Sequence, residues 1–225
     1  MKQITVLLAE DHIVVRESFR TMLGLETDLK VVGEAKDGRT AIASALKLHP
    51  DVVLMDIAMP LLNGLEATRQ LIDAWPAARV LMLSAHSDDA YVQKAMEVGA
   101  RGFLLKQSSS HIVCDAIREV HKGREFFSPE VSARRGKLNA QELNSKGTPK
   151  TKAIELTARE MEVLQLIAEG KANKETASEL GIGIKTVEKH REHLMKKLAI
   201  HDTAGLTRYA ISTGVIESHL QITIE

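Results

Sequence analysis

Two hydrophobic periods alternate along the first half of the chain. Short runs rich in leucine and β-branched residues cover residues 4–9, 31–35, 52–55, 79–83 and 102–105. Segments with helical periodicity lie near residues 12–25, 39–48, 64–75, 88–98 and 108–122. This alternation predicts βαβ units and a parallel sheet of five strands. The runs at 52–55 and 80–83 are apolar at every position, which is typical of central strands covered by helices on both faces.

The pattern changes after residue 123. Ser128 and Pro129 are typical of a helix start, and a weak helix is predicted to continue toward Leu143. Residues 144–152 contain no apolar side chain and indicate a flexible linker.

The C-terminal part is predicted to be entirely helical. Thr157 and Glu160 have the spacing of a capping box, and the helix that they open is expected to end at Gly170. Further helices are expected from 173 to 181, 184 to 198 and 203 to 213. The short glycine-containing turn between the second and third helices indicates a helix-turn-helix. The predicted parts are therefore a first domain (1–122), a linker (123–154), a helical domain (155–216) and a tail (217–225).

Composition and charge limit the classes of protein to which this chain can belong. The 225 residues include 30 basic and 30 acidic side chains, so any basic surface must be local. Residues 185–197 of the third predicted helix provide such a surface, with five basic residues against two acidic ones. The single cysteine, Cys114, excludes an intrachain disulfide. The N-terminus lacks the pattern of a signal peptide, and no apolar run approaches the roughly 18 residues of a membrane span, so we expect a cytoplasmic protein.

Polar side chains follow four of the five predicted strands. They are Glu10 and Asp11, then Asp56, Ser84 and Lys106. Ligands of open parallel sheets bind at the carboxyl ends of the strands, so these groups should share one pocket. Converging carboxylates repel one another unless a cation neutralises them, and a set of oxygen ligands favours Mg²⁺.

The same residues suggest phosphoryl chemistry. A carboxylate can accept a phosphoryl group as an aspartyl phosphate, and Asp56 is the best candidate because it stands alone between the other groups. Lys106 and Ser84 would then hold the phosphoryl oxygens. Any one of these residues alone would more often be a capping or solvated residue. Their combination favours a functional pocket.

The first domain resembles the receiver domain of bacterial two-component response regulators. Glu10 and Asp11, the segment from Asp56 to Pro60, Ser84 with Ala85, and Lys106 carry this resemblance. It implies a flavodoxin-like, doubly wound sheet in the order 2-1-3-4-5 and a phosphoryl group transferred to Asp56 by a sensor histidine kinase. It also implies the further site residues. Mg²⁺ would lie among Glu10, Asp11, Asp56 and the carbonyl of Ala58, Ser84 and Lys106 would bind the phosphate, and Phe103 would be the switch aromatic.

The helical domain resembles the LuxR-type DNA-binding domain, in its motifs at 156–164, 185–191 and 197–198. With the receiver, the chain resembles a response regulator of the NarL/FixJ type. The resemblance implies a phosphorylation-controlled transcription factor that dimerises, partly through its fourth helix, on a roughly palindromic promoter site, with RNA polymerase as a further candidate partner. The DNA contacts that it implies are Lys185, Thr186, Lys189 and Arg191. Gly183 and Thr176 depart from the usual serine cap and aliphatic residue, and Glu188 and Glu192 place negative charge beside the DNA face.

Three alternatives remain open at this stage. A phosphatase or phosphotransferase could use the same aspartyl phosphate, although haloacid-dehalogenase-type enzymes need a second aspartate at the position of Ala58. A phosphorylation switch could also act through a helical module that binds a protein instead of DNA, or the module could be a bundle with a merely solvated basic stripe. The regulator is the preferred interpretation, and it is not an enzyme.

Overall fold

The computed structural model describes residues 2–85, 89–127 and 156–216. The chain divides into two compact units, Met1–Ala153 and Ile154–Glu225, and each is described by itself. The weak helix predicted toward residue 143 and the linker at 144–152 lie outside the described residues. In the part of the chain that the structure describes, no helix is both long and apolar enough to cross a membrane.

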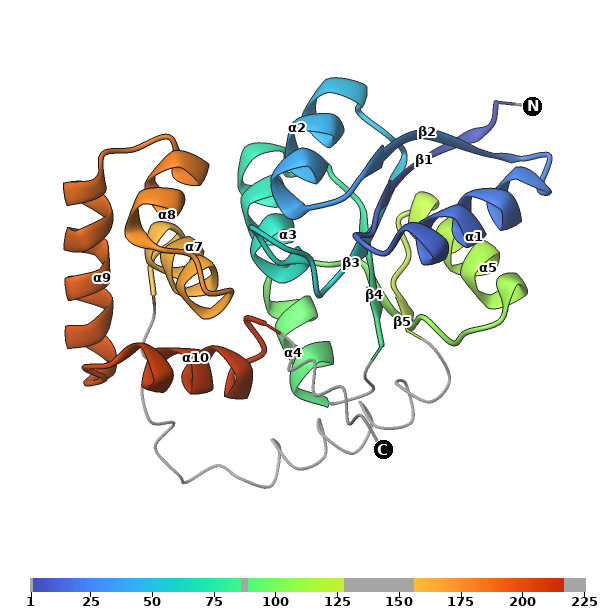
Figure 1. Ribbon diagram of the computed structural model, residues 1–225. Helices are drawn as coiled ribbons and strands as arrows, with labels where there is room; N and C mark the ends of the chain where they lie inside the picture. The colour runs from blue at the N-terminus through green and yellow to red at the C-terminus, as the bar shows by residue number, and fades with distance from the viewer. Residues whose placement is uncertain (1, 86–88, 128–155, 217–225) are drawn as a thin grey trace, which may run out of the picture. The chain divides into compact units, whose positions relative to one another are not determined.

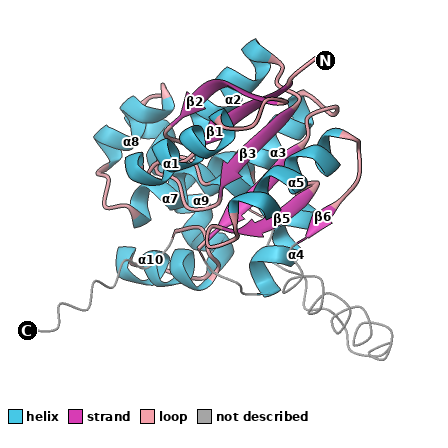
Figure 2. Ribbon diagram, turned by 90° about the vertical axis from the view of Figure 1, so that its right-hand side faces the viewer, coloured by secondary structure: helices cyan, strands magenta, loops and turns pink. Residues whose placement is uncertain are grey.

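The first unit is built on a parallel sheet (Figures 1 and 2). Its strands lie in the order β2-β1-β3-β4-β5-β6, which confirms the predicted order of the first five. The sixth strand was not predicted, because two residues are too short to show a period of two. The strands are β1 (Ile4–Ala9), β2 (Leu29–Ala35), β3 (Val52–Asp56), β4 (Val80–Ser84), β5 (Gly102–Leu105) and β6 (Phe126–Phe127).

Helices cover both faces of this sheet. In Figure 1, α2, α3 and α4 lie on one face and α1 and α5 on the other. Successive strand residues point to opposite faces, so Leu7 and Met55 belong to the first core, whereas Leu8 and Leu54 belong to the second. Every residue of β3 and β4 is buried, as predicted for central strands. The helices are α1 (Ile13–Gly24), α2 (Gly38–Leu48), α3 (Gly64–Ala74), α4 (Asp89–Glu97) and α5 (Ser110–His121).

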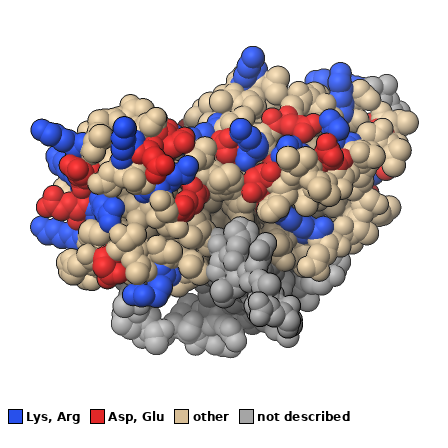
Figure 3. Space-filling model, in the orientation of Figure 1, with Lys and Arg blue, Asp and Glu red and all other residues tan. Residues whose placement is uncertain are grey.

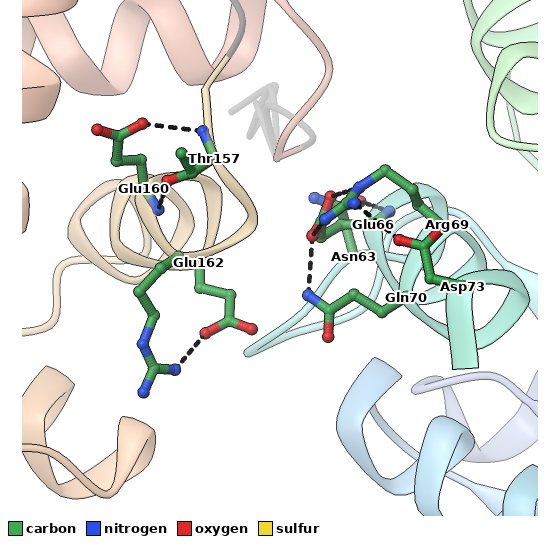
Figure 4. A network of polar contacts seen from close by, with 9 residues as sticks. Asn63, Glu66, Arg69, Gln70, Asp73, Thr157, Glu160 and Glu162 are labelled. Carbon is green, nitrogen blue, oxygen red and sulfur yellow. Dashed lines mark hydrogen bonds and ion pairs between the residues drawn. The ribbon is translucent and has the colours of Figure 1, made fainter.

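The loop after β3 is folded tightly against the end of its strand. Gly64 donates its N–H to the carbonyl oxygen of Ile57 at 2.8 Å. A Cβ atom added to Gly64 would overlap the carbonyl oxygen of Asp56, so this position requires glycine. Asn63 caps α3 by accepting the Glu66 N–H at 2.9 Å (Figure 4). These contacts hold Asp56 at a defined place at the edge of the sheet.

The second unit contains α7 (Ala158–Ala168), α8 (Asn173–Leu180), α9 (Ile184–Leu198) and α10 (Thr203–Ser212). Thr157 and Glu160 form the predicted capping box at the start of α7 (Figure 4). Gly181 adopts a φ of 63° in the turn between α8 and α9, in the left-handed region that favours glycine. Val187, Leu194 and Leu198 form the predicted buried stripe of α9, while His190 on the same stripe is half-buried.

Candidate functional site

Three acidic side chains meet at the carboxyl ends of β1 and β3. Glu10 and Asp11 follow β1, Asp56 is the last residue of β3, and the two strands pair in parallel. One carboxylate oxygen of each lies within 4.8 Å of the others, together with a ring nitrogen of His12. Glu10 and Asp56 are buried and Asp11 is partly exposed. The fold therefore brings together the three carboxylates that the sequence analysis assigned to one pocket.

Lys106 reaches the same cluster from the end of β5. Its Nζ lies 2.9 Å from Asp56 Oδ2 and 3.0 Å from Glu10 Oε1. Its backbone N–H donates to the carbonyl oxygen of Ser84 at 2.8 Å, and Ser84 is buried at the end of β4. Phe103 is fully buried on the sheet face that α2, α3 and α4 cover. Strands β1, β3 and β5 thus bring their charged groups together in one cluster, called the pocket below, and Ser84 stands at the end of the neighbouring strand β4.

Burial and neighbouring charges set the ionisation of this cluster. Burial, and next the carboxylate of Glu10, raise the pKa of Asp56 to about 7, although Lys106 opposes both. Burial alone would lower the pKa of Lys106, but the charge of Asp56 and the contacts with Glu10 outweigh it and raise that pKa. One ammonium group cannot neutralise three carboxylates. The pocket therefore has an excess of negative charge that a bound cation would relieve.

The donor set fits a small, hard cation. Within the part of the chain that the structure describes, three buried oxygens of this pocket lack a hydrogen bond of acceptable geometry, namely Glu10 Oε2, Asp11 Oδ1 and Asp56 Oδ2. Each nevertheless lies near a basic group, since Lys106 Nζ is 2.9 Å from the first and third, and His12 Nδ1 is 2.8 Å from the second. Carboxylate oxygens are preferred ligands of Mg²⁺. Ala58 lies two residues beyond Asp56 in the adjoining loop, where its carbonyl was predicted to be a further ligand.

Two residues at this edge were missed from the sequence. Arg16 of α1 donates from Nη1 to the carbonyl oxygens of Glu10 at 2.7 Å and Asp11 at 3.3 Å, and its Nε contacts Glu34 Oε2 at 3.1 Å. His12 lies beside both acidic side chains. A side chain that binds backbone carbonyls leaves no periodic or compositional signal, so only the fold reveals the role of Arg16 in holding this turn.

A second candidate site lies on α9. Lys185, Thr186 and Lys189 are exposed, as expected for residues that contact a ligand. Arg191 differs from them, because it donates to Asn173 Oδ1 at 3.3 Å and to Thr203 Oγ1 at 2.6 Å. Figure 3 shows blue Lys and Arg side chains among red Asp and Glu side chains at the left edge, where α9 lies in Figure 1.

Another basic residue of α9 has an internal partner. Lys197 donates to Glu160 Oε2 of α7 at 2.7 Å, and Glu160 is buried. The positive charge available on the outer face of α9 is therefore smaller than its composition indicates.

Comparisons with known proteins match each of the two units to a known family. Residues 6–118 match the model of the response regulator receiver domain, and residues 155–210 match that of the bacterial regulatory proteins of the luxR family. The response regulator protein VraR of Staphylococcus aureus is 36% identical over 95% of this chain and 99% of its own length. The chain belongs to the LuxR-type response regulator family. Members of this family are transcription regulators controlled by phosphorylation. The relatives that match this chain are regulators, not enzymes.

Solved structures of other response regulators share the fold. A LuxR-family response regulator from Aurantimonas sp. is 32% identical, with a TM-score of 0.60, over 62% of this chain and 99% of its own. RcsB of Salmonella enterica serovar Typhimurium, bound to a promoter in the presence of the phosphomimetic BeF3−, is 26% identical, with a TM-score of 0.58, over 95% of this chain and 100% of its own. A further structure holds two RcsB dimers on two parallel DNAs. It is 26% identical to this chain, with a TM-score of 0.56, over 94% of this chain and 99% of its own.

Proposed function

We propose that this response regulator accepts a phosphoryl group on Asp56 from a sensor histidine kinase, in a reaction that depends on Mg²⁺, and then binds promoter DNA as a dimer. The observation that carries the proposal is the buried carboxylate of Asp56, which lies 2.9 Å from Lys106 Nζ and within 4.8 Å of Glu10 and Asp11. A nucleophile, a cation for the phosphoryl oxygens and a set of metal ligands are the groups that phosphoryl transfer requires.

Each residue of the pocket has a separate task in this proposal. An Asp56 oxygen supplies the electron pair for the new O–P bond, while the P–N bond to the kinase histidine breaks and its electron pair stays on the imidazole. Lys106 balances the charge of the phosphoryl oxygens, and the Ser84 hydroxyl donates a hydrogen bond to one of them. Glu10, Asp11, Asp56 and the Ala58 carbonyl would hold Mg²⁺, which when bound supplies further positive charge.

Phosphorylation would then change the surface of the receiver. The modification replaces a carboxylate that pairs with Lys106 by a larger and more negative group. Lys106 and Ser84 reorganise around this group, and the buried Phe103 transmits the change to the surface of the receiver. A receiver face altered in this way favours dimers, which place two α9 helices on one DNA.

The exposed part of α9 is the proposed DNA interface. Lys185, Thr186 and Lys189 are exposed and would contact the duplex. The similar protein RcsB has been solved bound to a promoter, which supports DNA as the ligand of this unit. Arg191, which is held by Asn173 and Thr203, would reach DNA only after exchanging these partners. A dimer predicts a roughly palindromic site with half-sites about one helical turn apart. The protein acts where promoter DNA is present, which places it in the cytoplasm, with RNA polymerase as a further candidate partner.

A labelling experiment tests the phosphorylation site. Asp56→Asn should abolish the Mg²⁺-dependent addition of one phosphoryl group from a small phosphodonor, measured by intact-protein mass spectrometry, because an amide is a poor nucleophile. Asp73→Asn is the matched control, since Asp73 is exposed on α3 and should leave the labelling unchanged. Undiminished labelling of Asp56→Asn would place the phosphorylation site elsewhere.

A further inference from the structure

Four charged residues on the outer face of α9 form a repeated pattern. Lys185 and Glu188 are three residues apart, and so are Lys189 and Glu192. All four side chains are exposed. The two Lys-x-x-Glu units follow one another by four residues, which is about 6 Å along a helix. They occupy the N-terminal two-thirds of α9, the part of a recognition helix that meets base edges.

These charges are not used to hold the helical unit together. Among the residues that the structure describes, none of the four makes a hydrogen bond or an ion pair. Equivalent spacings do form ion pairs elsewhere, as between Arg159 Nη1 and Glu162 Oε2 at 2.6 Å. A spacing of three residues therefore allows an ion pair, yet these four charged residues of α9 form none among the described residues.

The charge of Lys185 does not stabilise α9 locally either. Lys185 lies in its first turn, where the partial positive charge of a helix terminus disfavours a cation. That turn contains no acidic residue, and its cap, Gly183, makes no side-chain hydrogen bond. By contrast, α7 begins with the capping box of Thr157 and Glu160. Residues that weaken a helix and make no compensating contact within the protein are expected at functional surfaces.

The pattern matches the chemistry of one type of base pair. The phosphates repel a carboxylate close to DNA, and a hydrogen bond that the carboxylate accepts from a base offsets this repulsion. In the major groove, cytosine presents the N4 amino donor, and its partner guanine presents the O6 and N7 acceptors. A glutamate beside a lysine offers the complementary acceptor and donor.

We propose that the two Lys-x-x-Glu units read two C·G base pairs in each half-site, with Glu188 and Glu192 accepting from cytosine N4 and the lysines donating to guanine. The inference rests on the proposed DNA-binding function and specifies its base preference. Because base pairs are stacked about 3.4 Å apart and the units about 6 Å apart, the two pairs lie one or two steps from each other.

Selection from a random DNA pool tests the inference. The full chain, treated with a phosphodonor, is compared with Glu188→Gln, Glu192→Gln and the control Glu17→Gln, whose side chain is exposed on α1. The wild type should select half-sites with two preferred C·G pairs. Each α9 variant should lose discrimination at a different one of them, about 10-fold, with a shift toward adenine, because glutamine pairs with adenine in the major groove. The control should select the same sites as the wild type.

Three other results overturn the proposal, for different reasons. If both α9 variants bind every sequence more tightly with an unchanged base preference, the carboxylates are only negative charges near the phosphates; an unchanged affinity and preference also excludes base reading. In both cases the DNA-binding function would stand. If the wild type selects no sequence with or without the phosphodonor, DNA recognition itself is refuted. The substitutions keep side-chain size at exposed positions, so folding is preserved.

Discussion

The pocket of the first unit and the outer face of α9 are organised in opposite ways. The pocket joins residues that are 96 positions apart in the chain, as in the contact between Lys106 and Glu10, and its central carboxylate is buried. The face of α9 is a single stretch of helix whose charges are exposed. The first site depends on the packing of distant segments, whereas the second depends on helical periodicity. A substitution in the packing around the pocket should therefore cost more than a substitution on α9.

The largest expected effect is that of Gly64→Ala. The new Cβ would overlap the carbonyl oxygen of Asp56, so the loop after β3 must move or the first unit unfolds. We expect a loss of at least about 3 kcal/mol in the free energy of unfolding. Urea unfolding followed by the fluorescence of Trp75, the single tryptophan, reports on this unit because Trp75 packs against its core.

Gly24→Ala is the control for this prediction. Gly24 is the last residue of α1, and a Cβ there meets no atom within 4 Å. Its substitution should change the stability by less than about 1 kcal/mol, because alanine restricts only the unfolded chain. Equal losses for the two variants would show that the loop after β3 is not tightly packed.

The next prediction concerns the pH dependence of the pocket. Because burial and Glu10 raise the pKa of Asp56 to about 7, well above its value in an unfolded chain, the metal-free protein loses stability as the pH rises from about 4 to about 7. Asp56→Asn removes this penalty. In EDTA, the free energy of unfolding of the variant relative to that of the wild type should rise by about 2 kcal/mol when the pH is raised from 5 to 8. Urea unfolding at both pH values measures this change.

Mg²⁺ provides the control for the pH prediction. A cation bound among the carboxylates stabilises their charged forms, so the wild type should recover much of the difference at pH 8 when Mg²⁺ is in excess. A constant difference between the two proteins at pH 5 and pH 8 in EDTA would contradict the raised pKa of Asp56.

The smallest expected effect is that of replacing one buried threonine in each unit by valine. The hydroxyl of Thr176 in α8 is buried and has no hydrogen-bond partner among the described residues, whereas Thr68 in α3 donates to Met82 Sδ at 3.2 Å. Thr176→Val should stabilise the helical unit by about 1 kcal/mol, because it removes an unsatisfied polar group. Thr68→Val should be neutral or destabilising. Hydrogen exchange of α7 and α9, measured by mass spectrometry, should show greater protection for Thr176→Val alone, and equal protection in both variants would refute the difference.

Most elements were predictable because their signals are local. Strand β1 and helix α9 begin and end where the hydrophobic pattern placed them, and Thr157 caps α7 as its spacing from Glu160 indicated. The order of strands came from the resemblance to receivers, and β6 escaped notice because of its length. Periodicity describes which face of an element is buried, but it does not say which distant element covers that face.

The amino-acid sequence by itself determined the two kinds of unit, the types of side chain at the strand ends and the charged pattern of α9. Only the tertiary structure decided that Lys106 contacts both Asp56 and Glu10, that Arg16 holds the turn beside them, and that Arg191 and Lys197 bind within the helical unit. The physical reason is that helix and strand periods arise from neighbouring residues. The partner of a charged side chain, by contrast, depends on which segments the packed core brings within a few ångströms.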